Sequence, residues 1–110
     1  MEGKVVLPAV ALALGLAWSQ AHAVDESAAQ ALMKKSGCLK CHAVSAKKEG
    51  PPFKETAAKY KGKPDGEAAL FKHLTTNPMI EVDGNKERHD ALKTKNEAEI
   101  RDVVQYILTR

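Results

Sequence analysis

The chain of 110 residues is poor in cysteine and in aromatic side chains. It holds two cysteines, two phenylalanines, two tyrosines and one tryptophan. This count excludes a framework of several disulfides and disfavours a zinc site, which typically takes its ligands from two separated pairs. Because so few aromatic side chains are available to fill a core, we expect another hydrophobic group to contribute to the interior.

The sequence also lacks internal repeats and the alternating pattern of strands. Apolar residues recur instead at helical spacing, interrupted by proline and glycine. We therefore predict an all-α domain of about four helices with long loops. The first helix is capped by Asp25 and ends near Gly37, the second covers residues 53–60, the third runs from Asp65 to Asn77, and a polar loop over residues 79–93 precedes the fourth.

The fourth helix has the clearest pattern. Thr94 and Glu97 have the spacing of a capping box, in which each side chain bonds a backbone N–H at the start of a helix. The residues that follow form one apolar stripe at positions i, i+3, i+4, i+7 and i+8: Ile100, Val103, Val104, Ile107 and Leu108. We expect this stripe to face the core.

Residues 1–23 have the pattern of a secretory signal peptide. Lys4 precedes an apolar run over residues 5–18, and Ala21 and Ala23 form a small-x-small cleavage site. A membrane anchor is the alternative, but the run is short for a span and contains Pro8. We predict cleavage after Ala23, one domain over residues 24–110, and export to a bacterial periplasm without stable membrane association.

Positive charge is concentrated in one part of the sequence. Residues 34–63 contain nine lysines and two glutamates, whereas residues 64–110 contain seven basic and nine acidic residues. Such a patch attracts partner proteins with acidic surfaces, although lysines can also serve only to solvate a surface. Nucleic acid is not expected as a partner of an exported protein, since only Phe53 and Tyr60 are interleaved with the lysines.

Both cysteines lie within the sequence SGCLKCH, residues 36–42. Four kinds of chemistry use such a pair: a zinc site, a thioredoxin-like dithiol, a structural disulfide and covalent haem attachment. The second requires a βαβ pattern that the sequence lacks, and a disulfide between Cys38 and Cys41 would close a trivial loop. In covalent attachment the two thiols add across the haem vinyl groups and His42 lies under the iron. CxxCH is the sequence signal for that attachment, so we predict one haem c.

These features resemble the class I c-type cytochromes, in particular the short bacterial periplasmic ones with one haem. The resemblance runs from the first helix through CLKCH to the sequences GPPFK at residue 50 and AAKY at residue 57, and on to the last helix. It implies that Cys38 and Cys41 carry the thioether links and that His42 is the proximal iron ligand. It also implies that His42 donates a hydrogen bond to the backbone carbonyl of Pro51.

The distal iron ligand departs from the family pattern. The family usually supplies a methionine from the loop before the last helix, and this chain has His89 there. Alignment on the last helix favours His89, alignment by residue type favours Met79, and an open or water-filled position is the third possibility. Met33 is expected in the core and His73 on the surface.

The resulting expectation is a small, monomeric electron carrier that is not an enzyme. Ligation by His42 and His89 would lower its reduction potential relative to methionine ligation, which suits exchange with multihaem cytochromes. A haem-based ligand-binding protein, either a gas sensor or a small peroxidase, is the alternative if the sixth ligand is easily displaced.

Overall fold

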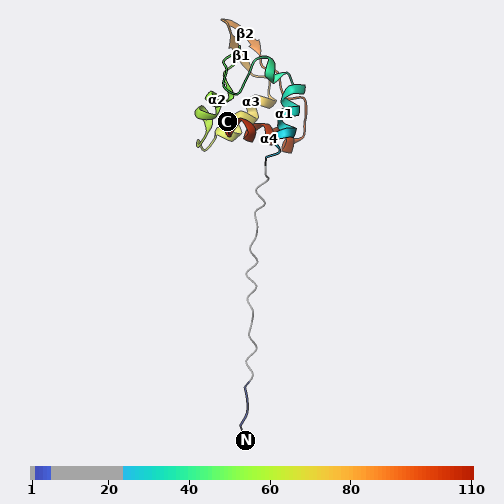
Figure 1. Ribbon diagram of the computed structural model, residues 1–110, viewed down its shortest axis with the longest axis vertical. Coiled ribbons are helices and arrows are strands. Elements are labelled where there is room, and N and C mark those ends of the chain that lie inside the picture. The colour runs from blue at the N-terminus through green and yellow to red at the C-terminus, as the bar shows by residue number, and fades with distance from the viewer. Residues whose placement is uncertain (1, 6–23) are drawn as a thin grey trace.

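The computed structural model describes residues 2–5 and 24–110 (Figure 1). The predicted signal peptide lies outside the described residues except for positions 2–5. Within the described part, no helix is long and apolar enough to cross a membrane. The elements of this part follow in the order α1 (Glu26–Lys35), the 3-10 turn η1 (Cys38–Lys40), α2 (Phe53–Tyr60), α3 (Gly66–Thr75), β1 (Met79–Val82), β2 (Asn85–Arg88) and α4 (Glu97–Leu108).

Helix α1 begins at its predicted cap and ends in a sharp turn. The Asp25 carboxylate accepts a hydrogen bond from the backbone N–H of Ala28 at 2.9 Å, which pairs one of the donors that a helix start leaves free. At the other end, Gly37 has a φ of +79°, a left-handed conformation that glycine adopts at little cost. The chain therefore turns from α1 directly into η1.

Helix α4 lies at the centre of the packing and contacts α1, α2 and α3. Val103 and Val104 are fully buried, so the predicted apolar stripe faces the core. Tyr106 joins it: its ring meets Phe53 edge-on, and its hydroxyl accepts a hydrogen bond from the Gln30 side chain at 3.4 Å. Burial of these apolar groups holds α1 and α4 together, and so fixes the turn that follows α1.

The predicted capping box at the start of α4 is wrong. The N-cap is Asn96, whose side chain accepts hydrogen bonds from the backbone N–H groups of Ala98 and Glu99 at 3.0 and 3.2 Å. Thr94 lies two residues before this cap. Its hydroxyl accepts a hydrogen bond from the backbone N–H of Asn96 and donates one to the Glu99 carboxylate. Asparagine caps as well as threonine does, and its position two residues later decides where the helix begins.

The first part of the predicted polar loop is in fact a β-hairpin. Strands β1 and β2 pair antiparallel, with Met79 opposite Arg88 and Val82 opposite Asn85. Asp83 and Gly84 connect them with φ of +50° and +81°, the two positive values of a type I′ turn. The hairpin pairs the backbone polar groups of a segment that would otherwise rely on water.

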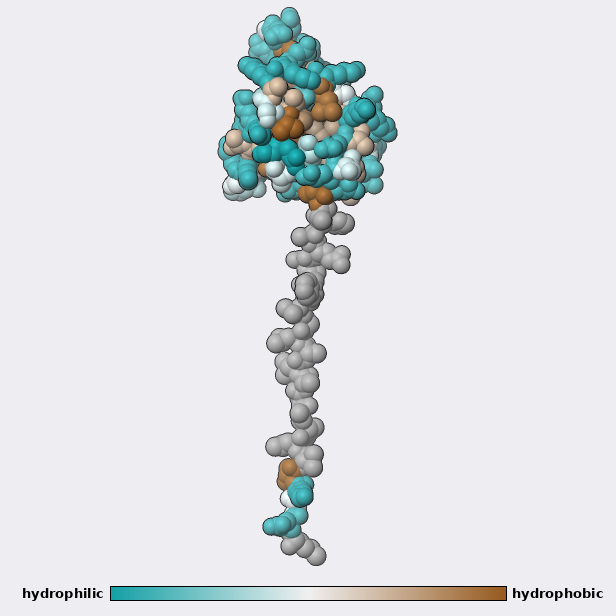
Figure 2. Space-filling model, in the orientation of Figure 1, coloured by the Kyte–Doolittle hydropathy of each residue, from teal (hydrophilic) through white to brown (hydrophobic). Residues whose placement is uncertain are grey.

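The hairpin projects from one end of the helical domain (Figure 1). On the face shown in Figure 2 it is almost entirely hydrophilic, whereas apolar residues gather near the middle of the helical part. The helices thus form the core as predicted, and the hairpin is an addition at its edge.

Candidate functional site

Both cysteines and His42 are positioned by one compact turn. The backbone N–H groups of Cys41 and His42 both donate to the Cys38 carbonyl, at 3.2 and 2.9 Å. The Gly50 N–H donates to the Cys41 carbonyl at 2.8 Å, so residues 43–50 fold back beside the turn. Short-range hydrogen bonds are therefore enough to bring the two thiols and the imidazole together.

The His42 ring is held on several sides. Its Nδ1 lies 2.7 Å from the Pro51 carbonyl oxygen, and because that oxygen can only accept, Nδ1 carries a proton; in the neutral ring this leaves the lone pair on Nε2. The Phe53 ring stacks on it at 5.5 Å with the planes inclined by 23°. A Cβ at Gly50 would overlap the ring, so glycine is needed for this close approach. The hydrogen bond and the stacked ring thus orient His42 so that Nε2 is the nitrogen left for a metal.

The two thiols are not prepared for dithiol chemistry. Burial raises the pKa of Cys38. Burial also raises the pKa of Cys41, helped by the adjacent Glu49 carboxylate, which accepts a hydrogen bond from the thiol at 3.5 Å. Redox-active CxxC motifs need a lowered pKa, because the thiolate is the nucleophile. The local electrostatics therefore favour a different use of the cysteines.

His89 directly follows strand β2, far along the chain from the cysteine turn, and its ring approaches that of His42. Its backbone N–H donates to the Pro78 carbonyl at 2.8 Å, and its own carbonyl accepts from the Asn77 side chain at 3.1 Å. These bonds close the base of the hairpin. The His89 ring lies 6.2 Å from the His42 ring, centre to centre, with the planes inclined by 49°.

That spacing fits a metal ion between the two imidazoles. A metal–imidazole bond is about 2 Å long and each ring centre lies about 1 Å behind its nitrogen, so two rings on one metal have centres about 6 Å apart. Burial lowers the pKa of His89, and so does the positive charge of a protonated His42. The neutral form, which has the lone pair a metal needs, is therefore favoured. Two imidazoles at this separation, with two thiols in the same turn as His42, are a donor set that fits a haem attached through thioethers.

The two methionines considered from the sequence lie in different surroundings. Met33 is 1% exposed and belongs to the core, as predicted. Met79 is 52% exposed at the first position of β1, opposite Arg88. Of the two candidates for the distal position, the structure brings His89 next to His42.

The predicted surface position of His73 is wrong. The side chain is half-buried, and its ring centre lies 4.5 Å from that of His89. Burial lowers the pKa of His73, and the neighbouring His89 adds to the effect. One signal in the sequence could have indicated this: His73 lies between Leu70 and Leu74 on the helix, beside the apolar face that these two residues form.

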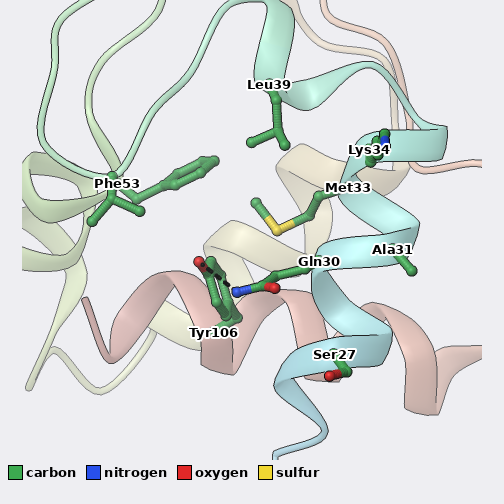
Figure 3. Close-up of a pocket in the computed structure, with 9 residues that line it drawn as sticks. Ser27, Gln30, Ala31, Met33, Lys34, Leu39, Phe53 and Tyr106 are labelled. Atoms are coloured by element: carbon green, nitrogen blue, oxygen red, sulfur yellow. Dashed lines mark hydrogen bonds between the residues drawn. The ribbon is translucent and has the colours of Figure 1, made fainter.

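A cavity of about 470 Å³ adjoins the cysteine turn (Figure 3). Met33 and Tyr106 line it from α1 and α4, Phe53 enters from α2, and Leu39 points into it from η1. Neither His42 nor His89 lines this cavity, so the cavity lies beside the candidate site. Leu39 and Phe53 connect the two, since Leu39 separates the cysteines and Phe53 stacks on His42.

The known sequences that this chain resembles are cytochromes c. The family model described as Cytochrome c matches residues 26–110. The chain is 40% identical over 45 residues to a cytochrome c-551 of Pseudomonas aeruginosa, covering 41% of this chain and 43% of that protein. It is 38% identical over 71 residues to a cytochrome c-551 of Stutzerimonas stutzeri, covering 64% and 65%. The chain thus spans less than two thirds of the length of these curated relatives.

Two solved structures are also similar. The class 1 cytochrome MtoD from Sideroxydans lithotrophicus ES-1 is 41% identical with a TM-score of 0.74, over 79% of this chain and 97% of that chain. Cytochrome c552 of Nitrosomonas europaea is 28% identical with a TM-score of 0.57, over 73% and 96%. These matches confirm the fold predicted from the sequence.

Proposed function

Because the chain belongs to the cytochrome c family, as a class I c-type cytochrome with one covalently bound haem c, we propose that it is a monohaem electron carrier. The observation that carries this proposal is the pair of imidazoles 6.2 Å apart beside two thiols. The bound haem supplies a one-electron Fe(III)/Fe(II) couple. If His42 and His89 both held the iron, no position on it would be left for a substrate, which would suit a carrier and not an enzyme.

Each residue of the candidate site has its own role in holding the haem. Cys38 and Cys41 bind the haem through thioether links, His42 is the proximal ligand and His89 is the distal ligand. The Pro51 carbonyl accepts a hydrogen bond from the Nδ1–H of His42, which fixes the ring and makes Nε2 a stronger donor. Imidazole stabilises ferric iron better than a thioether does, so the potential lies below that of a methionine-ligated relative.

Docking of redox partners uses the surface around the cysteine turn. Leu39 and Val44 are 43% and 37% exposed there, and the nearby lysines include Lys40, Lys47 and Lys48. Positive charge around a small apolar surface speeds encounter with acidic partners without making a complex that dissociates slowly. We propose that the protein works as a monomer and that nucleic acid is not a partner.

We further propose that the protein acts in the bacterial periplasm after removal of residues 1–23. A low-potential carrier in that compartment suits electron exchange between multihaem cytochromes of the two membranes. The test compares reduction by a multihaem cytochrome with reduction by a neutral small reductant at rising ionic strength. The multihaem partner is expected to react faster and to slow steeply with salt, because screening weakens the attraction. Equal rates would remove this class of partner.

A haem-based ligand-binding protein is the second candidate. One observation favours it: within the described residues, the buried Nδ1 of His89 has no hydrogen-bond partner. If Nε2 is the nitrogen that binds the iron, the second nitrogen of His89 has no partner, so His89 is held less firmly than His42 and an external ligand could replace it. Rapid binding of carbon monoxide to the ferrous protein would support this function, whereas inertness would support the carrier.

The first experiment is the near-infrared spectrum of the ferric holoprotein, recorded together with a redox titration. Bis-imidazole iron and methionine-ligated iron have charge-transfer bands at different wavelengths. A bis-imidazole band with a reversible one-electron titration supports the carrier with His89. A sulfur band assigns the site to Met79, and a high-spin spectrum favours the ligand-binding protein.

A further inference from the structure

The His73 ring packs directly against the candidate distal ligand. The ring centres of His73 and His89 lie 4.5 Å apart with the planes inclined by 58°, a separation at which aromatic rings attract each other. His73 belongs to helix α3, whereas His89 lies in the irregular segment after β2. The contact therefore connects a ring on a loop to a ring on a helix.

The His89 ring has little other support. Its buried Nδ1 finds no hydrogen-bond partner among residues 2–5 and 24–110, whereas the Nδ1 of His42 has the Pro51 carbonyl. The bonds to Asn77 and Pro78 hold the His89 backbone, but they leave rotation about the side-chain bonds free. The orientation of the ring therefore depends on what packs against it.

Helix α3 is a firm base for such packing. Leu70 and Leu74, on either side of His73 in the sequence, are buried in the core. The Leu74 carbonyl also accepts a hydrogen bond from the backbone N–H of Leu92 at 3.0 Å, which ties the segment after His89 to the end of α3. His73 is thus fixed relative to the same stretch of chain that carries His89.

We propose that His73 is a positioning residue, which fixes the plane of the His89 imidazole relative to that of His42 and so slows its release from the haem iron. This inference rests on the proposed function, in which His89 is the distal ligand. His73 itself does not bind the iron. Its effect comes through ring contact, so another aromatic ring of similar size at position 73 preserves it.

The test uses the holoprotein in four forms: wild type, His73→Ala, His73→Phe and the exposed neighbour variant Lys72→Ala. Two quantities are measured, the rate at which cyanide replaces the sixth ligand and the ferric electron paramagnetic resonance spectrum, which depends on the angle between axial imidazole planes. Loss of one aromatic contact is expected to speed cyanide binding roughly 2- to 10-fold in His73→Ala. Its resonance signal broadens or splits, while His73→Phe and Lys72→Ala behave as wild type.

Circular dichroism of each variant establishes that the fold is retained. Wild-type behaviour of His73→Ala in both measurements would overturn the positioning role, as would failure of His73→Phe to restore it. If His73→Ala loses the bis-imidazole band and His89→Ala keeps it, His73 is the ligand and the inference is wrong. A sulfur band in the wild type overturns the ligand assignment together with this inference. A bis-imidazole wild type with an unaffected His73→Ala overturns the inference alone.

Discussion

The two sides of the candidate haem site are built in different ways. On the proximal side, Cys38, Cys41 and His42 share one turn, and the carbonyl of Pro51 and the ring of Phe53 fix the imidazole from a short distance along the chain. On the distal side, hydrogen bonds at the base of a hairpin hold only the backbone of His89, and its ring packs against His73 of helix α3. The proximal side is therefore defined by local sequence, and the distal side by tertiary packing.

This difference affects how firmly each imidazole is held. His42 has a hydrogen bond at Nδ1 and a stacked ring, whereas the described residues give the Nδ1 of His89 no such bond. Second hydrogen bonds of this kind orient a metal ligand and raise its basicity. We therefore expect substitutions on the distal side to change ligand exchange and those on the proximal side to change the potential.

The largest effect is expected from His89→Ala, with Met79→Ala as the matched variant. His89→Ala removes the proposed distal ligand, so the ferric protein becomes high-spin and the ferrous protein binds carbon monoxide. Met79→Ala removes an exposed side chain of strand β1 in the neighbouring hairpin and leaves both spectra unchanged. Absorption spectroscopy of the two variants decides between the ligands, and the reverse pattern would assign the distal position to Met79.

Gly50→Ala tests the proximal side. The new Cβ overlaps the His42 ring and pushes it away from the Pro51 carbonyl, so His42 becomes a weaker donor and the reduction potential rises. Overpacking of this kind costs about 1–3 kcal/mol of stability. Redox titration and thermal unfolding measure the two effects. Pro51→Ala is the control, because it keeps the backbone carbonyl, and its potential should stay close to wild type.

Asn77→Ala loosens the base of the hairpin. The variant loses the hydrogen bond to the His89 carbonyl and places alanine at a φ of +49°, at a combined cost of about 1–2 kcal/mol. Cyanide then replaces the sixth ligand faster than in the wild type. Gly84→Ala, at the tip of the same hairpin with a φ of +81°, costs a similar amount and is expected to leave that rate unchanged. Equal acceleration in both variants would show that the whole hairpin holds the ligand.

The smallest effect concerns pH. Burial lowers the pKa of His89 below the ordinary histidine value of about 6.5. A detached, solvent-exposed His89 ring therefore takes up a proton at a higher pH than the buried ring does, and acid favours detachment only below about pH 6.5. Since the detached state binds more protons in that window, stability of the ligated state falls as pH drops below about 6.5 and is constant above it. We expect the low-spin spectrum to persist at pH 6.5 and to convert only at lower pH. Conversion above pH 6.5 would contradict the burial of this ring.

The parts of the fold that depend on local signals could be predicted. Helix α2 has the predicted bounds because Phe53 follows two prolines and Gly62 comes soon after Tyr60. The hairpin was missed although Asp83 and Gly84 are the preferred pair for its turn, because β2 is fully exposed and gives no apolar alternation. The cap of α4 was misplaced because two residues near its start can both serve as caps.

The site divides in the same manner. The cysteine turn with His42 could be predicted as a unit, because a few adjacent residues hold its groups. His89 is a candidate by position alone, and its approach to His42 depends on tertiary contacts of its segment with α3, through Leu92 and His73. The contact between His73 and His89 joins two segments that no sequence pattern relates, so it could be found only in three dimensions.

The closed base of the hairpin makes the distal segment modular. The Pro78 carbonyl and the His89 N–H meet at 2.8 Å, so the chain leaves the domain and returns to it at almost the same point. What lies between those two residues can then lengthen, shorten or change in charge while the imidazole stays where it is. Residues 79–88 could be replaced by a tag or by a partner's recognition peptide, and variation in this stretch offers a route to new redox partners on an unchanged metal centre.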